Sequence, residues 1–104
     1  MNHSIQVTLT AAATSVYVAL QGTEMALTND GETSWRGSEE RDIESELDLL
    51  MKVRGLNGTA WTIAITVDGA SGSLFKKSGT IEADNYSLLK ETIPMKKPAR
   101  KDSV

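Results

Sequence analysis

The sequence predicts an all-β domain, and three observations support this prediction. Apolar and polar residues alternate with period two in several segments, turn residues separate these segments, and only one stretch, residues 38–54, has a helix-like pattern. A single helix would have no second helix to pack against. The expected architecture is therefore a two-sheet antiparallel β-sandwich of seven or eight short strands.

The first strands are predicted from alternation. Ile5, Val7 and Leu9 share one face of the first segment, and residues 16–20 repeat the pattern. The clearest strand is "AWTIAITV", which ends at the turn residues Asp68-Gly69. Its apolar face holds Trp61, Ile63, Ile65 and Val67, and its opposite face is a weakly polar strip of Ala60, Thr62, Ala64 and Thr66.

The later strands are shorter, and one long loop is expected. "SLFKKSGTIEA" predicts one or two strands broken near Ser78-Gly79, and "YSLLKETI" predicts a last strand before Pro94. Residues 29–40 contain a turn at Asn29-Asp30-Gly31 and little apolar content, so they are expected to form the long loop.

Residues 38–54 fit either a strand or a helix. A helix would use Ser38 as N-cap and Gly55 as C′, which gives an alternative α+β fold with one helix near 38–54. We expect a strand, joined to the Trp61 strand as a hairpin through "GLNG", with Glu39 to Asp42 in the preceding loop. The strand would place Leu47, Leu49, Met51 and Val53 on one face and Glu46, Asp48, Leu50, Lys52 and Arg54 on the other.

Residues 1–95 are expected to form one sandwich domain of immunoglobulin-like architecture, and residues 96–104 a flexible basic tail. The tail holds four of the eleven Lys and Arg residues. Residues 1–95 then carry seven bases against thirteen acids, a net charge of −6. An acidic body repels phosphate, so nucleic acid is not expected as a partner.

Composition narrows the class of protein. No run approaches the ~18 to 20 apolar residues of a membrane helix, so no membrane span is expected. The chain has no cysteine, which excludes disulfides and thiolate sites. The N-terminal segment lacks the pattern of a signal peptide, which favours the cytoplasm and otherwise leaves the compartment open.

Catalysis and cofactors are not expected. The one histidine, His3, lies at an end expected to fray, so a Ser or Thr nucleophile has no positioned histidine base and a triad is not expected. A small hydrolase that uses paired carboxylates stays an alternative, because the chain has fourteen acids.

Residues 29–42 hold the candidate site residues. Trp35 and Arg36 are candidates for binding a protein or a sugar, although Trp35 is more strongly expected to cap the edge of the core. A calcium ion could be bound through carboxylate oxygens, with Arg36 and Arg41 competing for the same acids. The candidate metal ligands are Asp30, Glu32, Glu39, Glu40 and Asp42.

The sequence thus predicts a non-catalytic binding or self-assembly module that acts by protein–protein contact. Its partner would be another protein or a second copy in a homo-oligomer, and the Ala/Thr strip is one candidate surface. The alternative is a calcium- or carbohydrate-binding sandwich that uses the 29–42 loop.

Overall fold

The computed structural model describes residues 2–31, 33–69, 72–82 and 84–95. These residues form nine β-strands and, within the described part of the chain, no helix. The alternative fold with a helix near 38–54 is therefore wrong. The expected tail, residues 96–104, lies outside the described residues. The strands are β1 (Asn2–Ala11), β2 (Ser15–Leu20), β3 (Thr23–Met25), β4 (Thr28–Asn29), β5 (Ser34–Asp42), β6 (Glu46–Arg54), β7 (Ala60–Val67), β8 (Phe75–Thr80) and β9 (Tyr86–Pro94).

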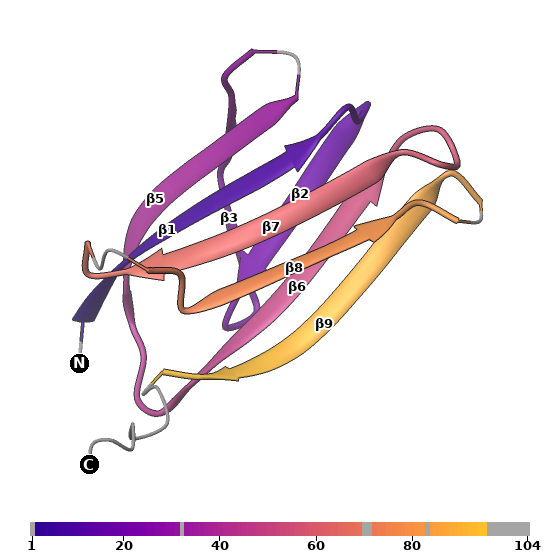
Figure 1. Ribbon diagram of the computed structural model, residues 1–104. Helices are drawn as coiled ribbons and strands as arrows, with labels where there is room; N and C mark the ends of the chain where they lie inside the picture. Colours follow the sequence, from indigo (N-terminus) through magenta and orange to yellow (C-terminus); the bar gives the residue numbers. More distant parts are fainter. Residues whose placement is uncertain (1, 32, 70–71, 83, 96–104) are drawn as a thin grey trace.

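The strands build two antiparallel sheets that pack face to face, as the sequence predicts for a β-sandwich (Figure 1). Sheet A has five strands in the order β4-β5-β1-β7-β8, and sheet B has four in the order β3-β2-β6-β9. All pairings between neighbouring strands are antiparallel. Most connections cross from one sheet to the other, and only β2–β3, β4–β5 and β7–β8 are joined within a sheet.

One apolar core fills the space between the sheets. In β6 the predicted alternation holds, because Leu47, Leu49, Met51 and Val53 are all buried. In β7, Trp61, Ile63 and Ile65 are buried and Val67 is half-buried. A strand with period-two alternation can bury only one face, so the register of each strand fixes which side chains remain outside. The core also contains Ile5, Val7, Leu9, Ala11, Val18, Leu20, Met25, Ile43, Ile81, Leu89 and Ile93.

The predicted hairpin between residues 46–54 and the Trp61 strand is wrong. β6 pairs with β2 and β9 in sheet B, whereas β7 pairs with β1 and β8 in sheet A. The "GLNG" segment instead carries the chain from one sheet to the other. β6 and β7 each have a continuous apolar face. The two faces can bury each other only if the strands lie in different sheets, one on each side of the core.

The long loop expected at residues 29–40 is also wrong. Residues 34–42 form β5, which pairs with β1 over nine residues, so Glu39 to Asp42 belong to a strand. The turn at Asn29-Asp30-Gly31 is confirmed, with Gly31 at φ 96° between β4 and β5. Within β5, Gly37 is required because a Cβ atom there would lie 2.7 Å from the backbone oxygen of Ala26.

β8 is not broken at Ser78-Gly79, in contrast to the sequence prediction. Gly79 is opposite Trp61 in the ladder, and a Cβ atom on Gly79 would lie 2.5 Å from Cζ2 of the Trp61 indole. The glycine therefore makes room for a large core side chain and does not end the strand.

Candidate functional site

The two residues predicted to bind a ligand, Trp35 and Arg36, point to opposite sides of β5. The Trp35 side chain is half-buried against the core, and its Nε1 donates a hydrogen bond to the Ala11 carbonyl at 3.3 Å. This position agrees with the expectation that Trp35 caps the core edge. Arg36 faces outward, 3.7 Å from a carboxylate oxygen of Asp30. The structure does not bring the two side chains into one site.

The predicted metal ligands are likewise divided. Asp30 lies at the β4–β5 turn beside Arg36, Glu39 faces inward beside Arg41, and Glu40 and Asp42 are on the outer side of β5. Glu32 lies outside the described residues. No group of three or more His, Asp or Glu side chains that could hold a metal ion occurs among the residues that the structure describes. Arg36 and Arg41 each form an ion pair with one of these acids, Asp30 and Glu39 respectively.

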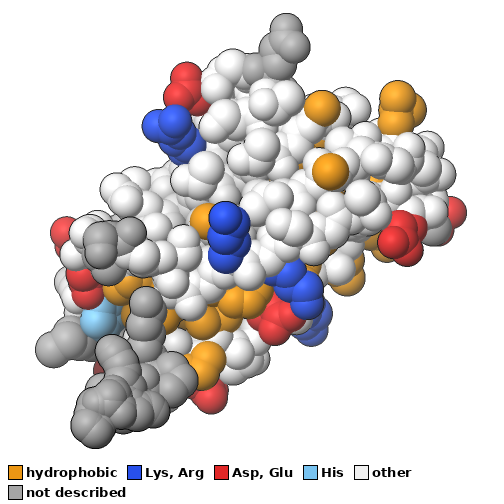
Figure 2. All heavy atoms as spheres, in the orientation of Figure 1, with side chains coloured by type: hydrophobic (Ala, Val, Ile, Leu, Met, Phe, Trp, Pro, Cys, Tyr) orange, Lys and Arg blue, Asp and Glu red, His pale blue; other side chains and the backbone are white. Residues whose placement is uncertain are grey.

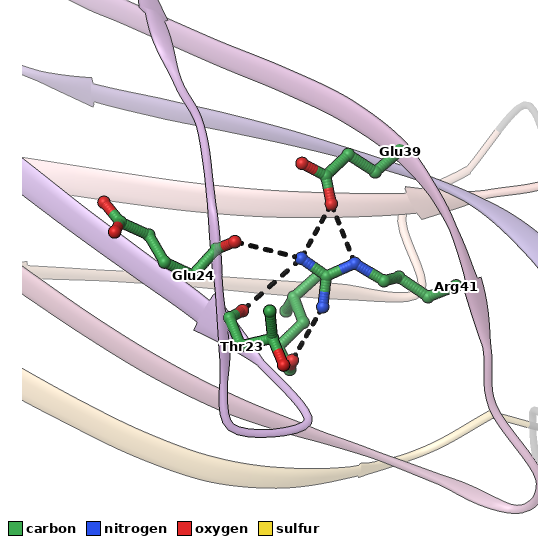
Figure 3. Close-up of polar contacts among 5 residues, drawn as sticks. Thr23, Glu24, Glu39 and Arg41 are labelled. Carbon is green, nitrogen blue, oxygen red and sulfur yellow. Dashed lines mark hydrogen bonds and ion pairs between the residues drawn. The ribbon is translucent and has the colours of Figure 1, made fainter.

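Arg41 has a role that the sequence did not indicate, because it joins the two sheets at one edge (Figure 3). The side chain is only 14% exposed, and its Nη2 lies 2.7 Å from Oε1 of Glu39. It reaches from β5 to the β2–β3 hairpin, where Nη1 donates to the Leu20 carbonyl at 2.8 Å. Nη2 also donates to the carbonyls of Thr23, at 3.4 Å, and Glu24, at 3.3 Å. We call this arrangement the Arg41 clasp.

The outer surface of sheet A is uncharged along β1 and β7 and carries Arg36, Glu40 and Asp42 on β5 and Lys76 on β8; we call it the neutral face. Figure 2 shows it as a broad, mostly white surface with few charged side chains. Thr62 and Ser78 are hydrogen-bonded across β7 and β8, with 2.9 Å between their hydroxyl oxygens. The predicted Ala/Thr strip of β7 is the middle of this larger face. Its uncharged residues are Asn2, Ser4, Gln6, Thr8, Thr10, Thr28, Ser34, Ser38, Ala60, Thr62, Ala64, Thr66, Ser78 and Thr80.

The outer surface of sheet B is different in kind, and we call it the contact face. Its centre is apolar: Ala19 and Leu50 are neighbours across β2 and β6, and Tyr17 lies beside them. On β9, Leu88 is 50% exposed and Tyr86 is 42% exposed. The outward side chains of β2, β6 and β9 that make up this face are Ser15, Tyr17, Ala19, Glu46, Asp48, Leu50, Lys52, Arg54, Tyr86, Leu88, Lys90, Thr92 and Pro94.

A shallow hollow of about 490 Å³ lies on the contact face. Ala19 and Leu50 line it, together with Tyr17, Asp48 and Lys90. Among the described residues, no carboxylate forms an ion pair with Lys52, Arg54 or Lys90. The hollow therefore has an apolar floor, and its lining holds one cation, Lys90, together with the acids Asp48 and Glu91.

The β2–β3 hairpin that borders this hollow is held from both sides. Gln21 and Gly22 form a two-residue turn with φ values of 54° and 78°. The Gln21 N–H donates to the Asp48 carbonyl at 3.0 Å, and the Gln21 side-chain oxygen accepts from the Asp48 N–H. With the Arg41 clasp on its other side, the hairpin is fixed relative to β6. The sequence gives a signal for this turn in "QG" between two apolar segments.

His3 is not at a frayed end, in contrast to the expectation. It lies in β1, and its Nδ1 donates a hydrogen bond to Oδ2 of Asp68 at 2.7 Å. The Ser4 N–H donates to the other oxygen of the same carboxylate at 2.9 Å. The His3 hydrogen bond, followed by that of Ser4, lowers the pKa of Asp68 below its ordinary value of 3.8. The contact ties β1 to the end of β7.

The comparisons with known proteins give no match: no family model, no curated protein and no solved structure matches the chain. In the described part of the chain, no helix is long and apolar enough to cross a membrane. Function therefore has to be inferred from the surfaces.

Proposed function

We propose that this chain is a non-catalytic binding or assembly module and that the contact face of sheet B is the surface that meets another protein. One observation carries the proposal: large apolar side chains gather on the outside of this sheet, where Leu88 is 50% exposed. Clustered exposed apolar side chains with a polar rim are typical of protein interaction sites. The immunoglobulin-like architecture stays a prediction, and the proposal does not depend on it.

The chemistry of the contact face supports protein contact. Tyrosine and arginine are the residues that most often dominate binding energy at interfaces, and this face presents Tyr17, Tyr86 and Arg54. A flat tyrosine ring loses little conformational entropy when it is covered, and its hydroxyl can still form a hydrogen bond. The cations of this face, Lys52, Arg54 and Lys90, would add electrostatic attraction at the rim. They would favour a partner with carboxylates at matching positions.

Lysine footprinting tests this proposal on the intact chain. A water-soluble acetylating reagent would be applied to dilute protein, to concentrated protein and to protein added to an extract of its source cells. Lys52 and Lys90 report on the contact face, and Lys76 on the neighbouring sheet is the matched control. We expect the first two to be protected, by at least threefold, in the concentrated sample or in the extract while Lys76 stays reactive. Equal reactivity of all three lysines under every condition would overturn the proposal.

A further inference from the structure

The charges on the outer side of β6 are sorted by sign. Five outward positions follow one another along this central strand: Glu46, Asp48, Leu50, Lys52 and Arg54. Two acids therefore precede the half-buried Leu50 at regular spacing, and two bases follow it at the same spacing. Successive outward residues of a strand are ~6.6 Å apart, so acid and base positions are equidistant from Leu50.

This order is self-complementary under one particular rotation. If two contact faces are placed together by a two-fold axis that crosses the strands at Leu50, the two β6 strands run antiparallel. Asp48 of each copy then lies over Lys52 of the other, and Glu46 lies over Arg54. An axis along the strands would instead place Lys52 over Lys52 and Asp48 over Asp48. Only the first arrangement pairs opposite charges.

We infer that the occupant of the contact face is a second copy of this chain, related by a two-fold axis through Leu50. The inference rests on the proposed function and names the partner at the same surface. The apolar centre supports it, because the half-buried side chains of Leu50 and Tyr17 lie at the position of the axis and would be covered first, above the already buried Ala19. Four ion pairs would surround this centre, two for each copy.

The arrangement also predicts a weak dimer. The strands of sheet B have three, six, nine and nine residues, and at ~4.8 Å spacing they offer roughly 430 Å² for each copy, which is near the lower limit for a specific interface. Glu24 and Lys90 lie in the same row of the ladder as Leu50. Across the axis, the Glu24 side chains of the two copies would therefore face each other, and so would the two Lys90 side chains, which places like charges together. We expect a dissociation constant on the order of 10 to 100 µM at low salt.

Charge reversal on β6 tests the inference by sedimentation velocity. Lys52→Asp alone gives two acid–acid contacts across the axis, and Asp48→Lys alone gives two base–base contacts. We expect each variant by itself to dimerise at least tenfold more weakly than the original chain. An equimolar mixture of the two variants should recover dimerisation as a heterodimer, because every contact then joins an acid to a base. The double variant Asp48→Lys, Lys52→Asp should dimerise like the original chain.

Two controls accompany these variants. Lys76→Asp changes the same charge on the neutral face and should leave the dissociation constant unchanged. Lys90→Gln removes a repulsion at the axis and should strengthen the dimer by about two- to threefold. Circular dichroism and thermal melts would confirm that each variant is folded.

The outcomes separate this inference from the proposed function. A monomer at millimolar concentration, or a mixture of the two single variants that fails to associate, overturns the second copy as occupant. If Lys52 and Lys90 are nevertheless protected in the cell extract, the contact face binds a different protein and the proposed function stands. A lack of protection under all conditions overturns both.

Discussion

The two sheets share one core but differ on their outer faces. The neutral face of sheet A presents small hydroxyl and amide side chains, whereas the contact face of sheet B presents leucine and tyrosine with charges separated by sign. Alternation determines only which side of a strand is buried and leaves the outer positions free to vary. The difference between the faces is therefore a difference in surface chemistry on equivalent scaffolds, which makes the neutral face a natural control for the contact face.

The largest expected effect concerns the clasp that holds the border of the contact face. Arg41→Ala should lower the free energy of unfolding by about 2 to 4 kcal/mol, because three carbonyls and Glu39 lose a charged donor that is largely shielded from water. Arg36→Ala on the outside of the same strand should cost at most ~0.5 kcal/mol, since its ion pair is exposed. Urea unfolding measures both values.

A conservative variant sharpens this prediction. Arg41→Lys keeps the charge but loses the planar fork that reaches several acceptors, so it should recover less than half of the loss. Equal stability of Arg41→Ala and Arg36→Ala would show that the clasp does not stabilise the fold. Faster amide exchange at residues 20–24 in the Arg41 variants would locate the effect in the β2–β3 hairpin.

The second prediction concerns a variant in which the contact face is given hydroxyl side chains like those of the neutral face. Leu50→Thr combined with Leu88→Thr should weaken association through the contact face by about tenfold or more, because two apolar side chains no longer leave water on binding. The free energy of unfolding should fall by no more than ~1.5 kcal/mol, since Leu88 is half exposed and Leu50 points away from the core. Sedimentation velocity and the lysine footprint both report the loss.

The matched control lies on the other sheet and keeps its hydroxyl chemistry. Thr62→Ser combined with Thr66→Ser changes two outward residues of the neutral face and should alter neither association nor the footprint. Weakened association in this control, with the leucine variant unaffected, would transfer the contact to sheet A.

The sequence predicts the two-layer architecture and the burial of β6 and β7, because every second residue on the inner side of each strand is apolar. It does not predict which strands pair, since β6 and β7 have equivalent apolar faces and only the packed core places them in opposite sheets. β5 was missed because its inner side contains Gly37, Glu39 and Arg41 in place of aliphatic residues. The order of charges on β6 is visible in "ELDLLMKVR", but its meaning depends on knowing that this strand lies in the middle of an exposed sheet.

The smallest expected effect distinguishes the sheets by their response to acid. The lowered pKa of Asp68 means that its carboxylate favours the folded state above the ordinary value of 3.8, and that this contribution is lost as the pH falls through the lower, folded value. Asp68→Asn should therefore be slightly less stable than the original chain at pH 7, with a difference that shrinks below about pH 4. Urea midpoints between pH 2 and 7 measure this difference. His3→Ala should return the pKa of Asp68 toward 3.8, as followed by carboxyl NMR, because the His3 hydrogen bond is the largest cause of the lowered value. A difference between Asp68→Asn and the original chain that does not depend on pH would show that the carboxylate charge contributes nothing. Amide exchange should change at the β1–β7 end of sheet A and leave the contact face of sheet B unaffected.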